Sequence, residues 1–384
     1  MITPLVASAS EIFAATRQLE TPFVRVDLHA LTRNVAALRA ALPSVEVWYA
    51  LKCNPHPQIA TTLADLGVGF EVASPQELRL LLSLGIPPDR IICLHTIKAH
   101  KFVRQLHDAG VRVMAVDCQD EIEKIASLAP DSRVVIRLEV ASHGSRVPLG
   151  GKFGCSPDEA VALNQYAARV GLRLAGVTLH VGSQCESLPT WVQALETCRA
   201  VCERLCLDGR PAEIISLGGG LPVPYTASVP DLPSICEVIR SANPHRFGTA
   251  DCRVTIEPGR AIAATAGTLI VSVVATAQRG GIRWVYLDAG THHGLFEWLP
   301  AAGGLTMPII AEPQDRPLQP CRLAGPTCDS IDVLPGIFEL PELRAGDRLA
   351  FCYAGAYSTA TASRFNGFEP PAIVIAGTEG ATDA

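Results

Sequence analysis

The sequence predicts an α/β domain built as a closed (β/α)8 TIM-like barrel, followed by a C-terminal β-barrel or β-sandwich domain. Up to about residue 260, short runs rich in valine and isoleucine alternate with stretches of helical periodicity, which is typical of parallel βα units. Polar residues gather where these runs end. After residue 262, strand-like runs separated by Gly and Pro turns take over, as in an all-β domain.

The elements follow in order along the chain. Residues 1–20 carry a weak helical pattern, and F-V-R-V-D-L is a short strand, so residues 1–28 form an arm and a strand that joins the β-domain. The barrel is expected over residues 29–262 and the β-domain over 263–384. The eight predicted barrel strands are V-E-V-W-Y-A, G-V-G-F-E-V, R-I-I-C-L, V-R-V-M-A-V-D, R-V-V-I-R-L, A-G-V-T-L-H, E-I-I-S-L-G and R-V-T-I-E-P. The predicted helices are 27–42, 75–84, 99–109, 119–128, 157–170 and 189–206.

A doubly wound open sheet competes with the barrel for this alternation, and the position of the polar residues favours the barrel. A barrel places its active site at the carboxyl end of every strand. The residues found there are Lys52, Glu71, Asp117, Arg137, His180, the glycines after Leu217, and Glu257. The β-domain is predicted from T-L-I-V-S-V-V-A-T, W-V-Y-L-D, P-I-I-A, R-L-A-F-C and A-I-V-I-A.

Composition excludes several classes of protein. The net charge of −6 is spread without a basic block, which disfavours nucleic acid as a partner. The N-terminus has no signal-peptide pattern, and the apolar run 261–277 is expected to form one or two buried strands and no membrane span. Thirteen cysteines without C-x-x-C indicate reduced thiols in the cytoplasm.

No metal site is expected. Cys198, Cys202 and Cys206 share a helix face without histidine or carboxylate neighbours, which favours core packing over metal binding. His292 and His293 are adjacent, so on a strand they point apart and make a poor ligand pair.

Lys52 ends the apolar run V-E-V-W-Y-A-L-K. A lysine at the end of a buried strand is costly unless it is paired or loses its charge. It is either a side chain that extends into solvent or an amine that forms a Schiff base with a carbonyl cofactor.

Three further strand ends carry candidate binding or catalytic residues. Gly218, Gly219 and Gly220 form either a phosphate cradle or a flexible turn. I-E-P-G-R offers Glu257 for a protonated ring nitrogen and Arg260 for a phosphate, or a structural ion pair. T-L-H-V-G-S-Q places His180 to stack on an aromatic cofactor or to move protons, or as a structural histidine, with Ser183 on the loop behind it.

Two motifs of the second domain complete the candidate site. G-P-T-C-D-S-I-D offers Cys328 as an acid near a reacting carbon and Asp329 as a carboxylate for an amine, although most cysteines here are packing residues. The loop G-A-Y-S-T-A-T-A-S-R-F-N-G-F holds Tyr357 among small residues. This suits a phenol that binds phosphate, or an ordinary turn-rich loop.

Taken together, the motifs A-L-K-C-N-P, F-E-V-A-S, K-F-G, H-V-G-S, G-G-G, E-P-G-R, G-P-T-C-D and G-A-Y…F-N-G-F are far more specific than any one of them. From about residue 22 to 375 the chain resembles the fold-type III pyridoxal-phosphate decarboxylases, which include ornithine, lysine and diaminopimelate decarboxylases. The T-C-D and F-N-G-F elements are closest to the ornithine/lysine side. The resemblance implies an alanine-racemase-like barrel with a β-domain, and a head-to-tail homodimer with shared active sites.

The resemblance also implies a role for each residue. Lys52 would bind pyridoxal 5'-phosphate as a Schiff base, His180 would stack on its ring, and Glu257 would pair with the ring nitrogen. The phosphate would lie against Gly218, Gly219, Gly220, Arg260 and Tyr357, near Ser183, with Gly259 in the E-P-G-R motif and with Glu71 and Arg137 near the cofactor. Cys328 would enter from the partner subunit to assist protonation of the decarboxylated carbon. Asp329 would bind the distal amine of an amino-acid substrate.

Two departures from the family pattern concern the cofactor and the substrate. Glu71 stands where the family usually has aspartate in F-D-x-A-S. The stretch after G-L-F reads E-W-L-P-A-A-G-G, so Ala301 and Ala302 stand near the place of an expected aspartate that grips the far amine in ornithine decarboxylases. A larger carboxylated intermediate of siderophore or secondary-metabolite assembly is therefore an alternative substrate.

Two further readings belong to other classes of function. A catalytically silent cofactor-binding regulatory relative would need neither Lys52 nor Cys328. A racemase of the same fold is disfavoured by Glu257 and by G-P-T-C-D, since the family's racemases place an arginine at the ring nitrogen.

Overall fold

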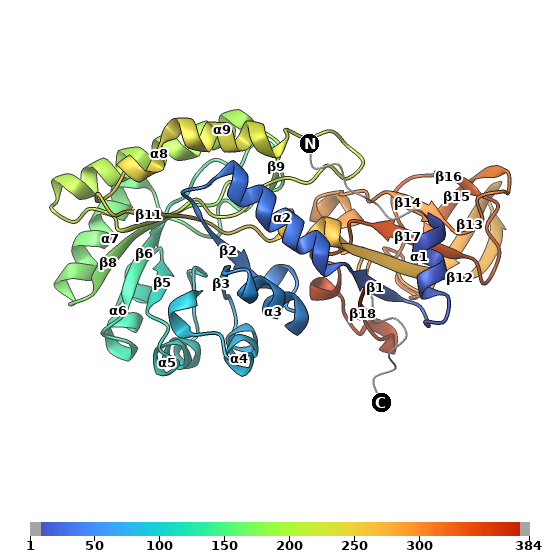
Figure 1. The fold of residues 1–384 in the computed structure, drawn as a ribbon, viewed down its shortest axis with the longest axis horizontal. Coiled ribbons are helices and arrows are strands. Elements are labelled where there is room, and N and C mark those ends of the chain that lie inside the picture. Colours follow the sequence, from blue (N-terminus) through green and yellow to red (C-terminus); the bar gives the residue numbers. More distant parts are fainter. Residues whose placement is uncertain (1–8, 377–384) are drawn as a thin grey trace. The chain divides into compact units, whose positions relative to one another are not determined.

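The computed structural model describes residues 9–376 (Figure 1). The first eight residues of the predicted arm and the last eight of the β-domain lie outside the described residues. The chain divides into two compact units. The barrel unit comprises Thr32–Pro222 and Val229–Gly259. The β-unit comprises the described residues up to Leu31, the segment Val223–Ser228, and the described residues from Arg260 onward.

The barrel unit contains the eight predicted strands, all paired in parallel in the order β4-β3-β2-β11-β10-β8-β6-β5. The two ends of this order are joined by a parallel bridge between Cys93 and Met114. The backbone N–H of Cys93 donates to Val113 at 3.0 Å, and that of Ala115 donates to Cys93 at 2.8 Å. The sheet therefore closes on itself, so the barrel prediction is confirmed over the open sheet.

The barrel strands and helices have the following bounds. The strands are β2 (Glu46–Ala50), β3 (Gly69–Glu71), β4 (Ile91–Ile92), β5 (Val113–Val116), β6 (Arg133–Arg137), β8 (Arg173–Thr178), β10 (Ile214–Ser216) and β11 (Arg253–Ile256). The helices are α2 (Leu28–Ala41), α3 (Pro57–Asp65), α4 (Pro75–Ser83), α5 (His100–Asp108), α6 (Gln119–Leu128), α7 (Pro157–Arg169), α8 (Leu188–Leu207) and α9 (Leu232–Ala242). A two-stranded ribbon pairs β7 (Ser145–Val147) with β9 (Ser183–Cys185).

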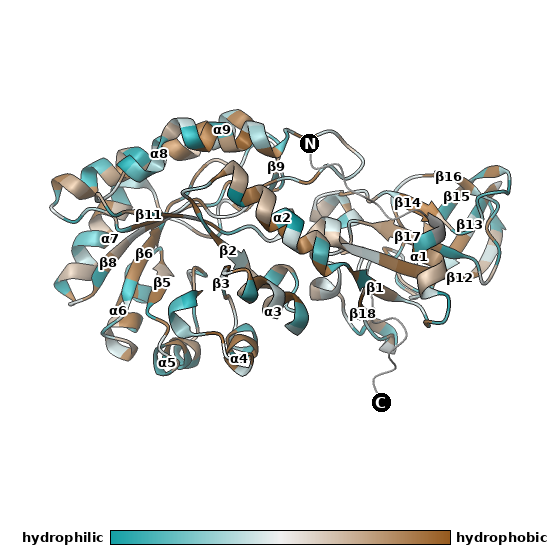
Figure 2. Ribbon diagram, in the orientation of Figure 1, coloured by the Kyte–Doolittle hydropathy of each residue, from teal (hydrophilic) through white to brown (hydrophobic). Residues whose placement is uncertain are grey.

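Barrel strands are uniformly apolar because both of their faces are buried. Figure 2 shows β2 and β11 as hydrophobic, whereas α5 and α8 mix hydrophobic and hydrophilic residues. Within the barrel, Trp48 packs with Ile92, Val135, Ile214 and other side chains from several strands. Each such buried side chain contributes about 1.5–3 kcal/mol. Gly69 is required beside Trp48, because a Cβ there would lie 2.5 Å from the indole ring.

The β-unit is a mixed sheet with the path β14-β17-β12-β13-β15-β16, and β1 pairs with both β12 and β18. Its strands are β1 (Phe23–Val26), β12 (Gly267–Arg279), β13 (Ile282–Leu287), β14 (Ile309–Ala311), β15 (Leu318–Ala324), β16 (Phe338–Pro341), β17 (Arg348–Cys352) and β18 (Ala372–Ile375). The short helix α1 (Ala9–Thr16) contributes Ile12 and Phe13 to a cluster with Phe23, Ile270 and Ala350.

Several local expectations were wrong. The run 261–277 does not begin as a strand, since α10 (Arg260–Ala263) and the turn η4 (Ala264–Ala266) precede β12. His292 and His293 lie in a turn and not on a strand. The sequence analysis also missed α3 and α9. Proline stands near the start of both helices, where its missing N–H costs nothing, but the clustered prolines read as loop.

No helix in the described range 9–376 is both long and apolar enough to span a membrane.

Candidate active site

Six neighbouring strands of the barrel carry the candidate residues at their carboxyl ends. In the order of the sheet these are β3 with Glu71, β2 with Lys52, β11 with Glu257, β10 with Gly218–Gly220, β8 with His180, and β6 with Arg137. Parallel strands of a barrel end on one rim. Residues up to 205 positions apart in the sequence, as Lys52 and Glu257 are, therefore share that rim. We call these residues the rim group.

Lys52 is bound to Glu71. Its Nζ donates to Oε2 of Glu71 at 2.8 Å, and the side chains are 45% and 2% exposed. The lysine lies in the turn η1 (Leu51–Cys53), where its neighbours Leu51 and Cys53 are buried. Burial of these neighbours fixes the backbone, and the buried carboxylate compensates the charge of the ammonium, which remains reachable. Glu71, which replaces the usual aspartate, reaches Lys52 directly.

A second lysine, Lys98, shows what a structural lysine looks like in the same barrel. It is buried, and its Nζ donates to the carbonyls of His95, Thr96 and Ala115 at 3.0, 2.7 and 2.6 Å. An ammonium has three N–H donors, and here all three have carbonyl acceptors. Lys52 differs because nearly half of its side chain is exposed, so its amine is available for chemistry.

Glu257 is a buried carboxylate that accepts a hydrogen bond from the hydroxyl of Ser216. Burial raises its pKa, the negative charge of Glu71 adds to this, and the Ser216 bond opposes it. Among the described residues, no cation lies within salt-bridge distance of this carboxylate. A buried carboxylate without a paired cation is costly, so the position suits a cationic group from a ligand.

His180 is held as a neutral ring. The backbone N–H of Gly182 donates to its Nδ1 at 3.0 Å, so Nδ1 is the unprotonated nitrogen. Burial lowers its pKa well below the usual range, and the positive charges of Arg137 and Lys52 act in the same direction. A neutral, fixed imidazole can present its face to an aromatic ring.

The three glycines after β10 pass close to this histidine. Gly218 and Gly220 adopt φ angles of 66° and 108°, which favour glycine. A Cβ on Gly219 would lie 3.2 Å from Nε2 of His180 and 2.8 Å from the carbonyl oxygen of Glu257. The loop therefore has room only for glycine, and a stretch of backbone without side chains is what an anion cradle requires.

Arg137 is the rim-group residue that ends β6, and burial lowers its pKa while the carboxylates of Glu257 and Glu71 oppose that shift. Two further predicted residues belong to the same unit: Ser183 begins β9, and Gly259 is the last residue of the barrel unit. The sequence analysis also placed Asp117 at the rim. Its carboxylate accepts the backbone N–H of Gly154 at 2.9 Å, so it anchors the K-F-G loop.

The β-unit carries a second group of side chains, centred on Arg260. Its Nη1 donates to Tyr225 and to Glu297, both at 2.8 Å, and its Nη2 donates to Glu297 at 2.5 Å. Its guanidinium carbon lies 5.0 Å from the ring centre of Tyr357. Burial alone would lower the pKa of Arg260, but Tyr225 and Glu297 outweigh it and raise the pKa well above its usual value.

Sequence reasoning missed Glu297 and Tyr225 as partners of Arg260. A signal for Glu297 was present, since an acidic residue in G-L-F-E-W-L stands between large apolar side chains and needs a buried cation. Ala301 and Ala302 follow in the turn η6 (Pro300–Ala302), where Ala301 is exposed. The stretch without an aspartate therefore contains one buried carboxylate, and that carboxylate binds Arg260.

Cys328 and Asp329 lie together in a loop of the β-unit. Oδ1 of Asn366 accepts the backbone N–H of Cys328 at 3.0 Å and lies 3.2 Å from its sulfur. Oδ2 of Asp329 accepts from Nε2 of His292 at 3.0 Å. The sequence analysis missed both contacts. It treated His292 only as a poor metal ligand, and no group of residues suited to a metal ion occurs among those described.

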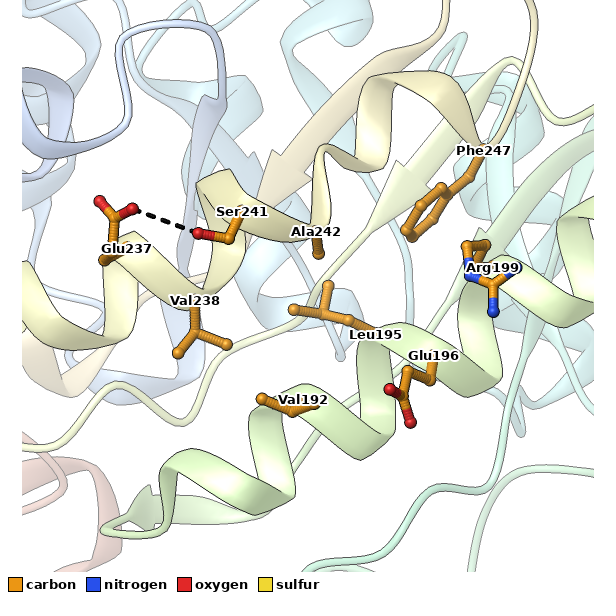
Figure 3. Close-up of a pocket in the computed structure, with 9 residues that line it drawn as sticks. All are labelled: Val192, Leu195, Glu196, Arg199, Glu237, Val238, Ser241, Ala242 and Phe247. Atoms are coloured by element: carbon orange, nitrogen blue, oxygen red, sulfur yellow. Dashed lines mark hydrogen bonds between the residues drawn. The ribbon is translucent and has the colours of Figure 1, made fainter.

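A hollow of about 420 Å³ lies between α8 and α9 (Figure 3). Val192, Leu195, Val238, Ala242 and Phe247 form its apolar lining, with Glu196, Arg199, Glu237 and Ser241. These residues include no lysine and no histidine, so this hollow offers none of the predicted chemistry.

Comparison with known proteins identifies the family. Residues 28–264 match the model of the family described as pyridoxal-dependent decarboxylase, pyridoxal binding domain. The lysine/ornithine decarboxylase of Selenomonas ruminantium is 34% identical over 362 residues, which are 94% of this chain and 91% of the relative. The ornithine decarboxylase of Schizosaccharomyces pombe is 34% identical over 372 residues, 93% and 84% of the two chains.

Solved structures agree with the sequence matches. The lysine/ornithine decarboxylase of Vibrio vulnificus, in complex with cadaverine, superposes with a TM-score of 0.88 at 34% identity, covering 96% of this chain and 98% of that one. The arginine decarboxylase of Paramecium bursaria Chlorella virus gives 0.88 at 26% identity, with 95% and 98% covered. With its parallel barrel, its β-unit and its rim lysine, this chain belongs to the fold-type III pyridoxal-phosphate-dependent decarboxylases, on the ornithine/lysine decarboxylase side of the family.

Proposed function

We propose that this protein decarboxylates an L-amino acid that carries an amine at its far end, such as ornithine, lysine or a derivative of one of them. The observation that carries the proposal is the rim group. There Lys52 is paired with Glu71 at 2.8 Å, beside a buried carboxylate, a neutral histidine and a glycine cradle. The names of the relatives, which are lysine, ornithine and arginine decarboxylases, support a substrate with a distal cation.

The rim group fits pyridoxal 5'-phosphate. The amine of Lys52 suits the cofactor's carbonyl, the unpaired charge of Glu257 suits a protonated ring nitrogen, and the neutral ring of His180 suits the ring face. A Cβ on Gly219 would fill the space at the cradle, so the three glycines would hold the phosphate against the backbone. When bound, the cofactor stores the electron pair left on the α-carbon after loss of CO₂.

The chain's own residues supply position and charge. We propose that Lys52 would hold the cofactor through its amine and would lie close to the α-carbon of the substrate. Glu257 keeps the ring nitrogen protonated, and Arg137 offsets the negative charge of Glu257 and Glu71. Because both Nη atoms of Arg260 are bonded to Glu297 or Tyr225, we propose Tyr357 as a direct phosphate ligand and Arg260 as the residue that positions its ring.

On the substrate side, we propose that Cys328 delivers the proton to the decarboxylated carbon and that Asp329 binds the distal amine. The hydrogen bonds that Cys328 donates to Oδ1 of Asn366 fix its position. In this proposal both residues act in the site of a second copy of the chain, so the enzyme is a homodimer. The thirteen free thiols support an enzyme of a reducing compartment, the cytoplasm.

A larger, carboxylated amino acid is a second candidate substrate. Its support is that the Asp329 carboxylate is already shared with His292 and that residues 297–304 contain no aspartate. A catalytically silent relative is the third reading, and one relative, 31% identical over 362 residues, bears the name antizyme inhibitor 2. The presence of both Lys52 and Cys328 opposes it.

The direct test is release of CO₂ from L-ornithine, L-lysine, other diamino acids and citryl-type conjugates. The purified protein is first loaded with cofactor and checked for a visible absorption band. We expect release from at least one diamino acid. The band without release from any candidate would support the silent relative, and loading without a band would overturn the cofactor assignment.

The homodimer has its own test. Lys52→Ala and Cys328→Ala chains, each with little activity, are mixed and allowed to exchange subunits. If Cys328 acts in the partner's site, mixed dimers contain one intact site and activity rises. Absence of recovery, with exchange verified by a mass difference between the chains, would contradict shared sites.

A further inference from the structure

His292 holds the carboxylate that we assign to the substrate's distal amine. It lies in the turn between β13 and η5 (Phe296–Trp298), and its Nε2 donates to Oδ2 of Asp329 at 3.0 Å. The other oxygen of Asp329, Oδ1, accepts the backbone N–H of Ile331 at 3.2 Å. Each carboxylate oxygen has two lone pairs. Asp329 can therefore keep both bonds and still accept a ligand.

The imidazole has a fixed place. Its ring stacks on Phe365 with ring centres 4.7 Å apart and an interplanar angle of 27°. The backbone carbonyl of His292 accepts the N–H of Ser363 at 2.9 Å, so the turn is tied to the segment that carries Phe365. The side chains of His292 and Asp329 are 21% and 28% exposed. The pair is thus preorganised and still reachable from outside.

Of the neighbouring titratable and charged groups, Asp332 and Arg364 have partners of their own, and burial lowers the pKa of His293. Asp332 accepts from Thr291 and Thr327, and Arg364, next to Phe365, is paired with Glu369 at 2.9 Å. His293 has its ring centre 6.4 Å from that of His292, and Cys328, which precedes Asp329, is bonded to Asn366. The charge presented at Asp329 therefore depends on His292.

We propose that His292 is a specificity-determining residue, which decides through its bond to Asp329 whether this carboxylate accepts a distal ammonium. This inference rests on the proposed function and deepens it. With a neutral imidazole the pair carries one net negative charge and attracts an ammonium. With an imidazolium the pair carries none, so a distal ammonium loses its counter-charge. The pair then no longer prefers a diamino acid to a neutral analogue of the same length.

The consequence is a substrate preference that depends on pH. The N–H of Ile331 and, less strongly, His292 lower the pKa of Asp329, so a change in the charge of the pair with pH comes from the imidazole. Selection for a distal amine should therefore be strong on the alkaline side and lost on the acid side.

The test compares L-lysine with L-norleucine, which lacks only the distal amine. The ratio of their kcat/KM values is measured from pH 5.5 to 9, so that proton transfers common to both substrates cancel. In the wild-type protein the ratio should fall about tenfold per pH unit below the inflection, through KM and not kcat. In His292→Phe, which keeps the stacking on Phe365, and in His292→Gln, which keeps a neutral donor, the ratio should show no such inflection.

A matched control is His107→Gln, which breaks another histidine–aspartate bond. His107 lies on helix α5, and its Nε2 is 2.7 Å from Oδ1 of Asp131. This variant should retain the wild-type ratio at every pH. An inflection that persists in both His292 variants, or a wild-type ratio that is flat across the range, would overturn the inference.

Calorimetry with cadaverine separates this inference from the proposed function. The affinity for cadaverine relative to n-pentylamine, which lacks the distal amine, is measured on the cofactor-loaded protein. In the wild-type protein this ratio should fall by about tenfold per pH unit on the acid side, and His292→Phe should remove this dependence. If no amino acid is decarboxylated but cadaverine binding follows His292, the proposed function fails and the role of His292 stands. If lysine is decarboxylated but cadaverine binding ignores His292, the inference fails alone.

Discussion

The rim group of the barrel unit and the Arg260 and Asp329 groups of the β-unit differ in how their residues are positioned. Rim residues follow directly after strands, so the sheet itself sets their spacing. Residues of the β-unit groups come from loops, turns and short helices, and side-chain bonds hold them: Arg260 to Glu297, and His292 to Asp329. Both of these bonds join residues 37 positions apart.

This contrast indicates where chemistry and specificity reside. A rim on a closed sheet keeps a fixed geometry through substitution of the surrounding loops, which suits the cofactor and the reacting carbon. Loop residues joined in pairs can change partner with one substitution. We therefore expect rim variants to lose the cofactor or the reaction, and variants of the Arg260–Glu297 and His292–Asp329 pairs to change stability, phosphate binding or substrate choice. Four experiments examine this division.

The largest effect is expected for Lys52→Ala. Removal of the amine should lower decarboxylation by about three orders of magnitude or more and abolish the visible band of the bound cofactor. The control is Lys101→Ala, an exposed lysine on α5, which should behave as wild type. A Lys52→Ala protein that keeps the band would remove the rim group from the reaction.

Glu297→Gln should cause the largest loss of stability. The Arg260–Glu297 pair is almost fully buried, at 4% and 10% exposure, and breaking a buried pair leaves a charge uncompensated at a cost of about 3–5 kcal/mol. Denaturant unfolding measures this. Glu312→Gln, in the exposed pair with Arg17 at 3.6 Å, should cost about 0–1 kcal/mol. Equal losses would show that Arg260 does not depend on Glu297.

Gly219→Ala should weaken cofactor binding through sterics. The added Cβ would approach the carbonyl oxygen of Glu257 to 2.8 Å, and such overpacking costs about 1–3 kcal/mol. Cofactor titration and thermal unfolding measure the two effects. At Gly150, where a Cβ would meet only Ser142 at 3.6 Å, alanine should change neither. If Gly219→Ala binds cofactor normally, the glycine loop is not the cradle.

Glu257→Gln should show the smallest effect on stability. The direction of the change in Tm should indicate whether Glu257 is kept for a ligand or for the fold. Burial raises the pKa of Glu257 above its usual 4.5, so the folded, cofactor-free protein prefers the protonated form and loses stability as pH rises through that pKa. The glutamine variant cannot ionise, so its Tm should exceed that of wild type at pH 8, and the difference should disappear near pH 4.

The same variant should bind cofactor more weakly, because glutamine cannot neutralise a ring nitrogen. Higher stability without cofactor together with weaker cofactor binding is the expected signature. A Tm below that of wild type at pH 8 would instead indicate that Glu257 is a structural carboxylate.

The eight barrel strands and the residues that end them could be predicted from the sequence. The reason is that a parallel strand buried on both faces needs a continuous apolar run, and a barrel brings every strand end to one rim. Local composition and one topological rule were enough to place Lys52, Glu71, His180 and Glu257 together. Helices α3 and α9 escaped because their prolines read equally as loop. The start of run 261–277 escaped because its apolar residues continue into a strand, although its alanines favour helix.

Only the tertiary structure decided which loop residues meet. Three contacts have no periodic signal in the sequence, because each depends on how loops fold back on the chain. They are the bond of Arg260 to Glu297, the bond of Gly182 to Nδ1 of His180, and the bond of His292 to Asp329. The sequence by itself therefore determined the barrel, its rim and the lysine that lies there. The partners of Arg260 and Asp329, on which phosphate binding and substrate choice depend in our proposal, follow from long-range packing, since a single side-chain contact between distant loops has no local pattern to predict it.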